Sequence, residues 1–307
     1  MQENPLQTSA SPLTDAEENQ LSKSDGLSAE LSIRQKEIDA IKGADFMAFR
    51  ERGLDLPETE KANLYARFPV LKRYDEAYGK VFREVSETKV SGRTPAVWFV
   101  YNMGLVVKTR KTVFSIDLSH RQDLSSVPFC DFACYTHNHD DHCDDGCLDA
   151  FNAAGKLIIS NFEANEGAKR THGGYGGFTR RPRTFTIGDV RIETHVAAHN
   201  SYLLDFTMPL EITIGDYRIY HSGDMCYHYE IMLNRPGPDL WIVHPYCGMN
   251  VGDGVQMVCP KLTVIAHLQE LGHDKWRWSY EDGLRAVRDC NAQGYAAIMP
   301  TWGERIV

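Results

Sequence analysis

A short apolar run, residues 133–135, leads directly into the segment THNHDDH at residues 136–142. Three imidazoles and two carboxylates within six residues are costly to bury without a partner charge. A divalent cation supplies that charge, and His with Asp is a ligand set for zinc, iron or manganese. At the end of a strand, His137 and His139 project to one side, and the following turn directs Asp141 and His142 toward a second position nearby. A solvated loop rich in His and Asp is the alternative, and the pattern favours a metal site.

Short segments rich in β-branched and aromatic residues surround this motif and predict strands. They span residues 96–101, 105–107, 112–117, 133–136, 156–160, 184–187, 190–195, 211–214, 218–221, 240–244, 262–266 and 296–299. Helices are expected at 146–154, 164–170 and 280–293. Strands with interspersed helices fit a two-sheet α/β sandwich better than a regular βαβ repeat.

Three units are predicted along the chain. Residues 1–28 are rich in Ser, Asn, Gln, Pro and acidic residues without hydrophobic periodicity, which predicts a flexible tail. Residues 29–90 form an expected helical extension, with amphipathic patterns at 29–42 and 70–86. Residues 91–307 hold the strands and all the candidate site residues.

The HxHxDH pattern after a strand resembles the metallo-β-lactamase superfamily, over residues 95–307. The resemblance implies an α/β fold, an αββα sandwich that binds one or two metal ions at one edge, here with an N-terminal helical extension. Residues 197–200 (AAHN) match the element that supplies the third ligand of the first metal, which would be His199 beside His137 and His139. Residues 220–224 (YHSGD) match the element whose aspartate, Asp224, bridges the two metals. The order and spacing are most similar to the branch that includes L-ascorbate-6-phosphate lactonase.

The sequence departs from that branch near its C-terminus. A late strand of the branch delivers a histidine before Trp-Gly or Tyr-Gly, whereas this chain has Thr301 before Trp302-Gly303. A threonine hydroxyl is a poor zinc ligand. We expect His267, at the end of another apolar run, to complete the second site with Asp141, His142 and Asp224. His273 and His244 are the alternatives, as is a vacant second site.

The remaining histidines have less specific patterns. His195 is expected to support His199 or to lie in the core, and His221 is expected to orient Asp224 by a hydrogen bond. His228 follows the Asp224 element and is a candidate proton donor. His120 and His172 are expected in loops or on the surface.

Two further features bear on the site. The eight cysteines are expected to be structural thiols, with Cys143 or Cys226 as an alternative sulfur ligand. Residues 172–183 join a glycine-rich loop to Arg180, Arg181 and Arg183, whose guanidinium groups suit an anionic substrate. An ordinary exposed hairpin is the alternative for this loop.

Composition limits the partners of the chain. Its 307 residues include 33 Lys and Arg against 42 Asp and Glu, a net charge of −9, which argues against general nucleic-acid binding and polybasic membrane binding. The N-terminus lacks the basic start and apolar core of a secretory signal. The cysteines indicate a reducing compartment. We therefore expect a cytoplasmic protein with a small-molecule substrate, for which an anionic molecule is one option, and with the capacity to form a homo-oligomer.

The resemblance implies a metal-dependent hydrolase with two divalent ions, zinc or manganese, with iron as an alternative. Hydroxide shared by the two ions would attack a small ester, lactone or phosphoester, and Asp141 or a nearby histidine would move a proton to the leaving group. Two other functions stay open: iron-dependent thiol dioxygenation, and binding without catalysis at a vestigial site, which the threonine at position 301 motivates.

Overall fold

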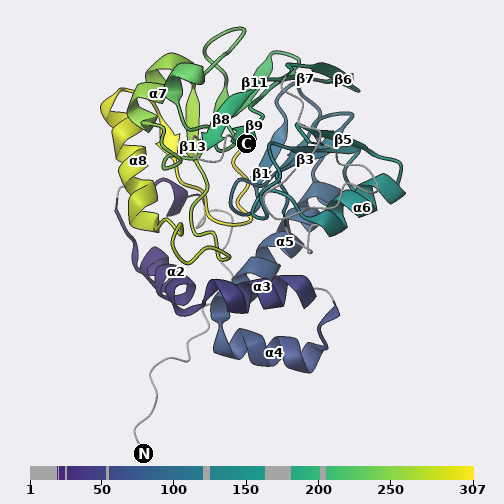
Figure 1. Cartoon of the computed structure of the whole chain (residues 1–307), viewed down its shortest axis with the longest axis vertical. Helices are drawn as coiled ribbons and strands as arrows, with labels where there is room; N and C mark the ends of the chain where they lie inside the picture. Colours follow the sequence, from purple (N-terminus) through teal and green to yellow (C-terminus); the bar gives the residue numbers. More distant parts are fainter. Residues whose placement is uncertain are drawn as a thin grey trace, which may run out of the picture.

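The computed structural model describes residues 19, 21–24, 26–52, 55–119, 125–162, 181–200 and 205–307. Two β-sheets form its centre, and one continuous apolar core contains side chains from both of them, including Trp98 of the first sheet and Trp241 of the second. Figure 1 shows helices α7 and α8 on one side of the sheets and α6 on the other. This is the predicted αββα arrangement.

The first sheet has five strands in the order β1-β2-β3-β4-β5. Their bounds are β1 Ala96–Phe99, β2 Leu105–Lys108, β3 Val113–Ile116, β4 Phe132–Tyr135 and β5 Leu157–Ser160. Strands β3, β4 and β5 run parallel, so their carboxyl ends meet at one edge. Asp117 follows β3 at this edge, and the THNHDDH segment follows β4.

The second sheet has seven strands in the order β14-β13-β12-β11-β10-β7-β6. Their bounds are β6 Thr184–Ile187, β7 Val190–Thr194, β10 Leu210–Ile214, β11 Tyr217–His221, β12 Leu240–Val243, β13 Leu262–Ile265 and β14 Ala297–Ile298. Strands β11 to β14 are parallel, which places the residues after β11, β12 and β13 at one edge as well. A separate pair, β8 Ala197–Asn200 and β9 Asp205–Thr207, carries His199.

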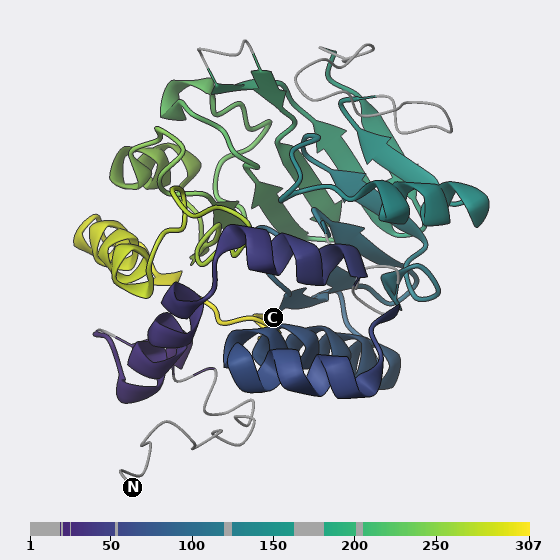
Figure 2. The ribbon, with the colours of Figure 1, turned by 60° about the horizontal axis from the view of Figure 1, so that its bottom comes forward.

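Helices cover the outer faces of the two sheets, and the N-terminal part of the chain is helical. They are α2 Ala29–Ala40, α3 Gly43–Arg52, α4 Glu58–Arg67, α5 Pro69–Glu87, α6 Asp145–Ala153, α7 Val251–Val258 and α8 Tyr280–Ala292, with a short 3-10 helix η3 at His228–Glu230. Figure 2 shows α2, α3, α4 and α5 gathered on one side of the sheets. Helix α5 buries an apolar stripe from Val70 to Val85 and begins with Pro69 in its first turn, where proline costs no hydrogen bond.

Most elements lie within two residues of their predicted positions. The sequence did not predict α3, α4, α7 or the strand β9. Helix α7 contains Gly252 and Gly254, which weaken a helical pattern. A Cβ on Gly254 would lie 2.9 Å from a ring carbon of Trp241, so the glycine is required for packing against β12. The helix predicted at 164–170 lies outside the described residues, as does most of the 1–28 tail. Among the residues that are described, no helix is long and apolar enough to cross a bilayer.

Candidate metal centre

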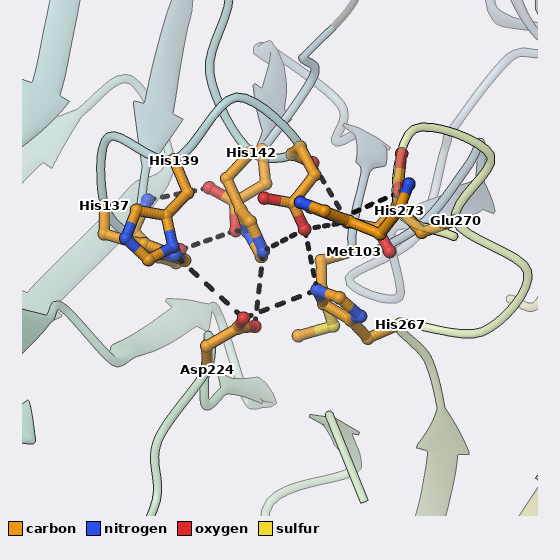
Figure 3. Close-up of polar contacts among 12 residues, drawn as sticks. Met103, His137, His139, His142, Asp224, His267, Glu270 and His273 are labelled. Atoms are coloured by element: carbon orange, nitrogen blue, oxygen red, sulfur yellow. Dashed lines mark hydrogen bonds and ion pairs between the residues drawn. The ribbon is translucent and has the colours of Figure 1, made fainter. Parts of the chain in front are cut away.

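Strand ends deliver the candidate ligands to one place. His137 and His139 follow β4, Asp224 follows β11, and His267 follows β13, while His199 lies within β8. Figure 3 shows the loop after β4 facing Asp224 and His267 across a small space. The parallel strands explain this convergence, because their carboxyl ends share an edge of each sheet.

The first cluster consists of His137, His139 and His199. One ring nitrogen from each lies within 4.8 Å of the others, and His199 Nε2 is 3.0 Å from His139 Nδ1. The ring centroids of His137 and His199 are 4.6 Å apart. Three imidazoles at this spacing match the donor set of a catalytic zinc site, which leaves a further position open.

The second cluster consists of Asp141, His142, Asp224 and His267, all buried, with their ligand atoms within 4.8 Å of one another. His267 Nε2 is 2.9 Å from Asp141 Oδ2 and 3.3 Å from Asp224 Oδ2. His142 Nε2 is 3.5 Å from Asp141 Oδ2 and 3.3 Å from Asp224 Oδ1.

Asp224 lies between the two clusters. Its Oδ1 faces His142, and its Oδ2 is 4.0 Å from Nε2 of both His137 and His199. A carboxylate that faces two groups of ligand atoms is placed to contact a cation in each. The structure thus brings together all seven predicted metal ligands, and their role as ligands stays a prediction.

Burial and charge oppose each other within the second cluster. Burial favours the neutral forms, yet the carboxylates of Asp224 and Asp141 raise the pKa of His142 well above its usual value. Burial alone would also lower the pKa of His267, but the carboxylates of Asp224 and Asp141 raise it to about 10. The two imidazoles in turn hold the pKa of Asp224 well below its usual range, although burial alone would raise it.

In the first cluster, burial outweighs the attraction of the carboxylate. Burial and then the neighbouring imidazoles, beginning with His142, lower the pKa of His137 well below its usual value. A neutral imidazole is the form that binds a metal. His137 Nε2 is buried without a hydrogen bond, as is Asp224 Oδ1. Buried polar atoms normally have partners, so these two orphaned atoms, one facing each cluster, fit ligand atoms for a divalent cation.

Two buried side chains that the sequence did not reveal hold the ligands in place. Asp117 accepts hydrogen bonds from the Thr136 amide at 2.7 Å and the Thr136 hydroxyl at 2.7 Å, and its Oδ2 is 3.0 Å from His142 Nδ1. A carboxylate on the far nitrogen of a ligand imidazole fixes the tautomer and the ring orientation. The signal for Asp117 was present, since an aspartate ends the predicted strand 112–117.

Asn102 performs a similar function for the second cluster. Its Nδ2 donates to the Asp141 carbonyl at 2.9 Å and to Asp141 Oδ2 at 3.3 Å, and its carbonyl accepts the His267 amide at 2.8 Å. Both Asn102 and His267 have positive φ, 55° and 57°. Asparagine tolerates this conformation better than most residues, and nothing in the local sequence pattern marks it.

Of the alternatives to His267, His273 lies apart from the clusters, whereas His244 lies beside them, with a ring nitrogen within 4.8 Å of an Asp224 oxygen and of Cys247 Sγ. His273 Nδ1 is 2.9 Å from Glu270 Oε2, and its side chain is 44% exposed. His244 is buried and stacks on His267, with ring centroids 3.9 Å apart and planes at 6°. Thr301 is buried and donates its amide to Glu304 Oε2 at 3.0 Å, and the two clusters defined above do not contain it.

Three further histidines, His221, His195 and His228, belong to neither cluster. His221 was expected to bond the Asp224 carboxylate, but its Nδ1 accepts the Gly223 amide at 3.2 Å and its Nε2 is 3.1 Å from the Met103 carbonyl. His221 therefore stabilises the turn before Asp224 through these two contacts. His195 Nε2 is 3.7 Å from Glu211 Oε2. His228 begins η3, half-buried, and packs by its ring edge against Tyr229.

Cysteines adjoin the site at one point. Cys226 donates to the His199 carbonyl, and Cys247 Sγ is 3.3 Å from His199 Nδ1. The sequence offered Cys226 as an alternative sulfur ligand but did not single out Cys247. Cys143, the other alternative, is buried in a small apolar cluster beside α6.

The predicted anion-binding loop is only partly described. Residues 172–180, including His172 and Arg180, lie outside the described residues, as does His120. Arg183 donates to the Ser160 carbonyl, and its guanidinium lies 5.3 Å from the Phe185 ring centroid. This arginine therefore joins β5 to β6.

Comparison with family models and with curated protein sequences finds no match. Solved structures do match. A possible metal-dependent hydrolase from Veillonella parvula is 14% identical with a TM-score of 0.51, over 69% of this chain and 98% of that one. The metallo-β-lactamase fold protein YhfI from Bacillus subtilis is 16% identical with a TM-score of 0.50, over 66% of this chain and 95% of that one. The chain therefore has the metallo-β-lactamase fold.

A third match covers a larger share of this chain. CmlA, a diiron β-hydroxylase from Streptomyces venezuelae, is 14% identical with a TM-score of 0.50, over 80% of this chain. The match covers 59% of CmlA, so this chain corresponds to little more than half of that protein.

Proposed function

We propose that the protein is a metal-dependent hydrolase with two divalent cations. The observation that carries this proposal is the pair of ligand clusters that share Asp224, at the strand ends of a metallo-β-lactamase fold. The first cation would bind His137, His139 and His199. The second would bind Asp141, His142, Asp224 and His267.

Cations in such a site lower the pKa of water to about 7 and polarise a carbonyl or phosphoryl oxygen. The chain would supply orientation and proton transfer. Asp141 has one oxygen, Oδ2, near His267 and Asn102, so its carboxylate is fixed within the site. We assign Asp141 the proton transfer to the leaving group.

His228 remains our candidate for a second proton donor. It lies on η3, and Glu230 of the same helix accepts the Ala198 amide at 2.9 Å. This contact fastens η3 to the strand that carries His199. A proton donor at this position would act from the His199 side of the site.

The proposed substrate is a small ester, lactone or phosphoester, most similar to the substrates of the ascorbate-6-phosphate lactonase branch. The sequence order of the candidate ligands and the charge of the site support this substrate class. Zinc and manganese are the proposed metals, because imidazole and carboxylate donors suit both. We also place the protein in the reducing cytoplasm, since all eight cysteines are free thiols.

The test is metal analysis paired with a substrate screen. The purified chain should hold two zinc or manganese ions and hydrolyse at least one of a panel of lactones, phosphodiesters and aryl esters. Asp224→Ala should abolish that turnover. Asp216→Asn, which changes an exposed side chain in the turn between β10 and β11, should retain it. A protein that binds metal but hydrolyses none of the panel would contradict the proposal.

Iron-dependent oxidation is the second candidate. It is favoured by the wider match to the diiron β-hydroxylase, 80% of the chain against 69% for the hydrolase-like protein. The same ligands suit iron, for thiol dioxygenation at one ion or for hydroxylation at two. Iron in the purified protein together with dioxygen consumption would favour this candidate over hydrolysis.

A further inference from the structure

Two cysteines meet beside the proposed metal centre. Cys226 lies two residues after Asp224, and Cys247 lies four residues after the end of β12. Their sulfur atoms are 3.7 Å apart. Residue 248 is a glycine with φ of 110°, and a Cβ there would lie 3.3 Å from the Cys226 carbonyl oxygen, so the two backbones approach closely at this point.

Each thiol contacts the backbone of a proposed ligand. Cys226 donates to the His199 carbonyl, and Cys247 donates to the Asp224 carbonyl at 3.1 Å. The Asp224 carbonyl is also 2.9 Å from His199 Nδ1, the ring nitrogen that faces away from His139. The thiol pair therefore supports one ligand of the first cluster and the carboxylate that lies between both clusters.

We propose that Cys226 and Cys247 form a reversible disulfide that controls metal binding, an inference that rests on the proposed function. The sulfurs need to close from 3.7 Å to the roughly 2.05 Å of a disulfide, a shift of less than 2 Å. Cys226 is buried and Cys247 is half-buried, so Cys247 is the thiol that an oxidant reaches first.

Hydrogen peroxide is a sufficient oxidant. The Cys247 sulfur attacks the O–O bond, takes one oxygen as a sulfenic acid and releases water. The Cys226 sulfur then attacks that sulfur, the S–O bond breaks, and a second water leaves. Two thiols are oxidised and one peroxide is reduced. Disulfides in a reducing compartment are usually transient and redox-sensing, which fits a switch.

Oxidation removes both S–H donors from the ligand backbones. The carbonyls of His199 and Asp224 lose these partners, and the segment after Asp224 is drawn toward residue 247. Loss of contacts that orient metal ligands typically weakens metal binding 10–100-fold. We expect the zinc dissociation constant of the oxidised protein to rise at least tenfold.

The test is peroxide treatment of the zinc-loaded full chain, followed by digestion and mass spectrometry. A peptide pair joined through Cys226 and Cys247 should form and should disappear with dithiothreitol. Cys226→Ser and Cys247→Ser should each abolish the pair. Cys259→Ser, which removes an exposed thiol at the end of α7, should retain it. Absence of this cross-link at peroxide levels that oxidise Cys259 would overturn the proposal.

Zinc affinity is then measured by competition with a chromophoric chelator, on reduced and oxidised protein. An affinity loss of tenfold or more, absent from the two serine variants, supports control of metal binding. A cross-link that leaves affinity unchanged refutes it. If the reduced protein binds no metal at all, the proposed function fails, whereas the cross-link result still reports on the cysteine pair.

Discussion

Removing the His267 imidazole tests the assignment of the second metal site. We expect His267→Asn to leave the chain with one metal in place of two. The imidazole is one of four side chains in the cluster, with Nε2 2.9 Å from Asp141 Oδ2 and 3.3 Å from Asp224 Oδ2. Disturbing groups that only orient a ligand costs 10–100-fold in metal affinity, so losing the ligand itself should cost about 100-fold or more, roughly 2.7 kcal/mol.

Asparagine is the informative replacement because of the backbone. His267 has φ of 57°, a conformation that asparagine tolerates and alanine does not. The substitution also removes a cationic partner from two buried carboxylates, which costs about 3–5 kcal/mol in the metal-free protein. Thermal unfolding of the variant with and without zinc separates this stability loss from the loss of a metal.

The assay is metal stoichiometry by atomic absorption after gel filtration, on His267→Asn and Thr301→Ala in parallel. Thr301 occupies the position where the similar branch has histidine, and its hydroxyl lies 3.3 Å from Glu304 Oε2. Thr301→Ala should keep both metals and lose about 1 kcal/mol of stability. Loss of a metal only in the Thr301 variant, or two metals retained in the His267 variant, would refute the assignment.

Asp224→Ala should lose one metal and nearly all turnover, because the two cations would then repel each other without the carboxylate between them. Metal analysis and steady-state kinetics measure both losses. Asp117→Asn should keep the metal stoichiometry but weaken affinity 10–100-fold in a chelator competition, since the amide cannot accept all of the bonds that the carboxylate accepts. The pKa of His267 rises from 6.5 to about 10 on folding without metal. Its contribution to stability is therefore full below pH 6.5 and is lost as the pH rises through about 10, a fall in melting temperature that zinc should suppress. Glu211→Gln should destabilise the fold by about 3 kcal/mol in chemical denaturation without changing metal content, because it leaves Arg218 buried 2.9 Å from a neutral group.

Each of these has a control or a contrary result. Asp216→Asn breaks an ion pair whose side chains are 79% and 83% exposed, so it should change stability far less than Glu211→Gln. Unaltered metal affinity in Asp117→Asn would show that His142 is oriented by the backbone alone. A melting temperature that is flat between pH 7 and pH 10 in the metal-free protein would contradict the charged state of His267.

The sequence pointed to the candidate ligands partly through a local rule and, for His199 and Asp224, through the family resemblance. Each of His137, Asp224 and His267 stands just after a β-rich run, and parallel strands bring such residues to a common edge. Thr301 stands after such a run too, but the turn that follows directs its amide and hydroxyl to Glu304. A strand-end position is therefore informative only together with the chemistry of the residue.

The supporting residues escaped prediction because their roles depend on distant partners. Asn102 forms hydrogen bonds with Asp141 and His267, which are 39 and 165 positions away in the chain, and the sequence does not reveal its positive φ. Cys247 meets Cys226 because β11 and β12 pair in parallel, and the glycine at residue 248 lies close to the Cys226 backbone. Local patterns report periodicity and charge, whereas these contacts depend on the packing of separate strands.

Charge balance connects the ligand geometry with the proposed substrate. Three buried carboxylates lie around the two imidazoles of the second cluster: Asp141 and Asp224 within it, and Asp117 on the far nitrogen of His142. Without a metal, protons on the two imidazoles offset two of these three negative charges, which is why both imidazoles have raised pKa values. Two divalent cations would displace those protons and, before a bound water gives up its proton, would leave the site with a net positive charge of about one. A buried site with that charge favours an anionic group, so a phosphorylated or carboxylated substrate should bind better than its neutral analogue, and matched pairs in the substrate screen will measure the difference.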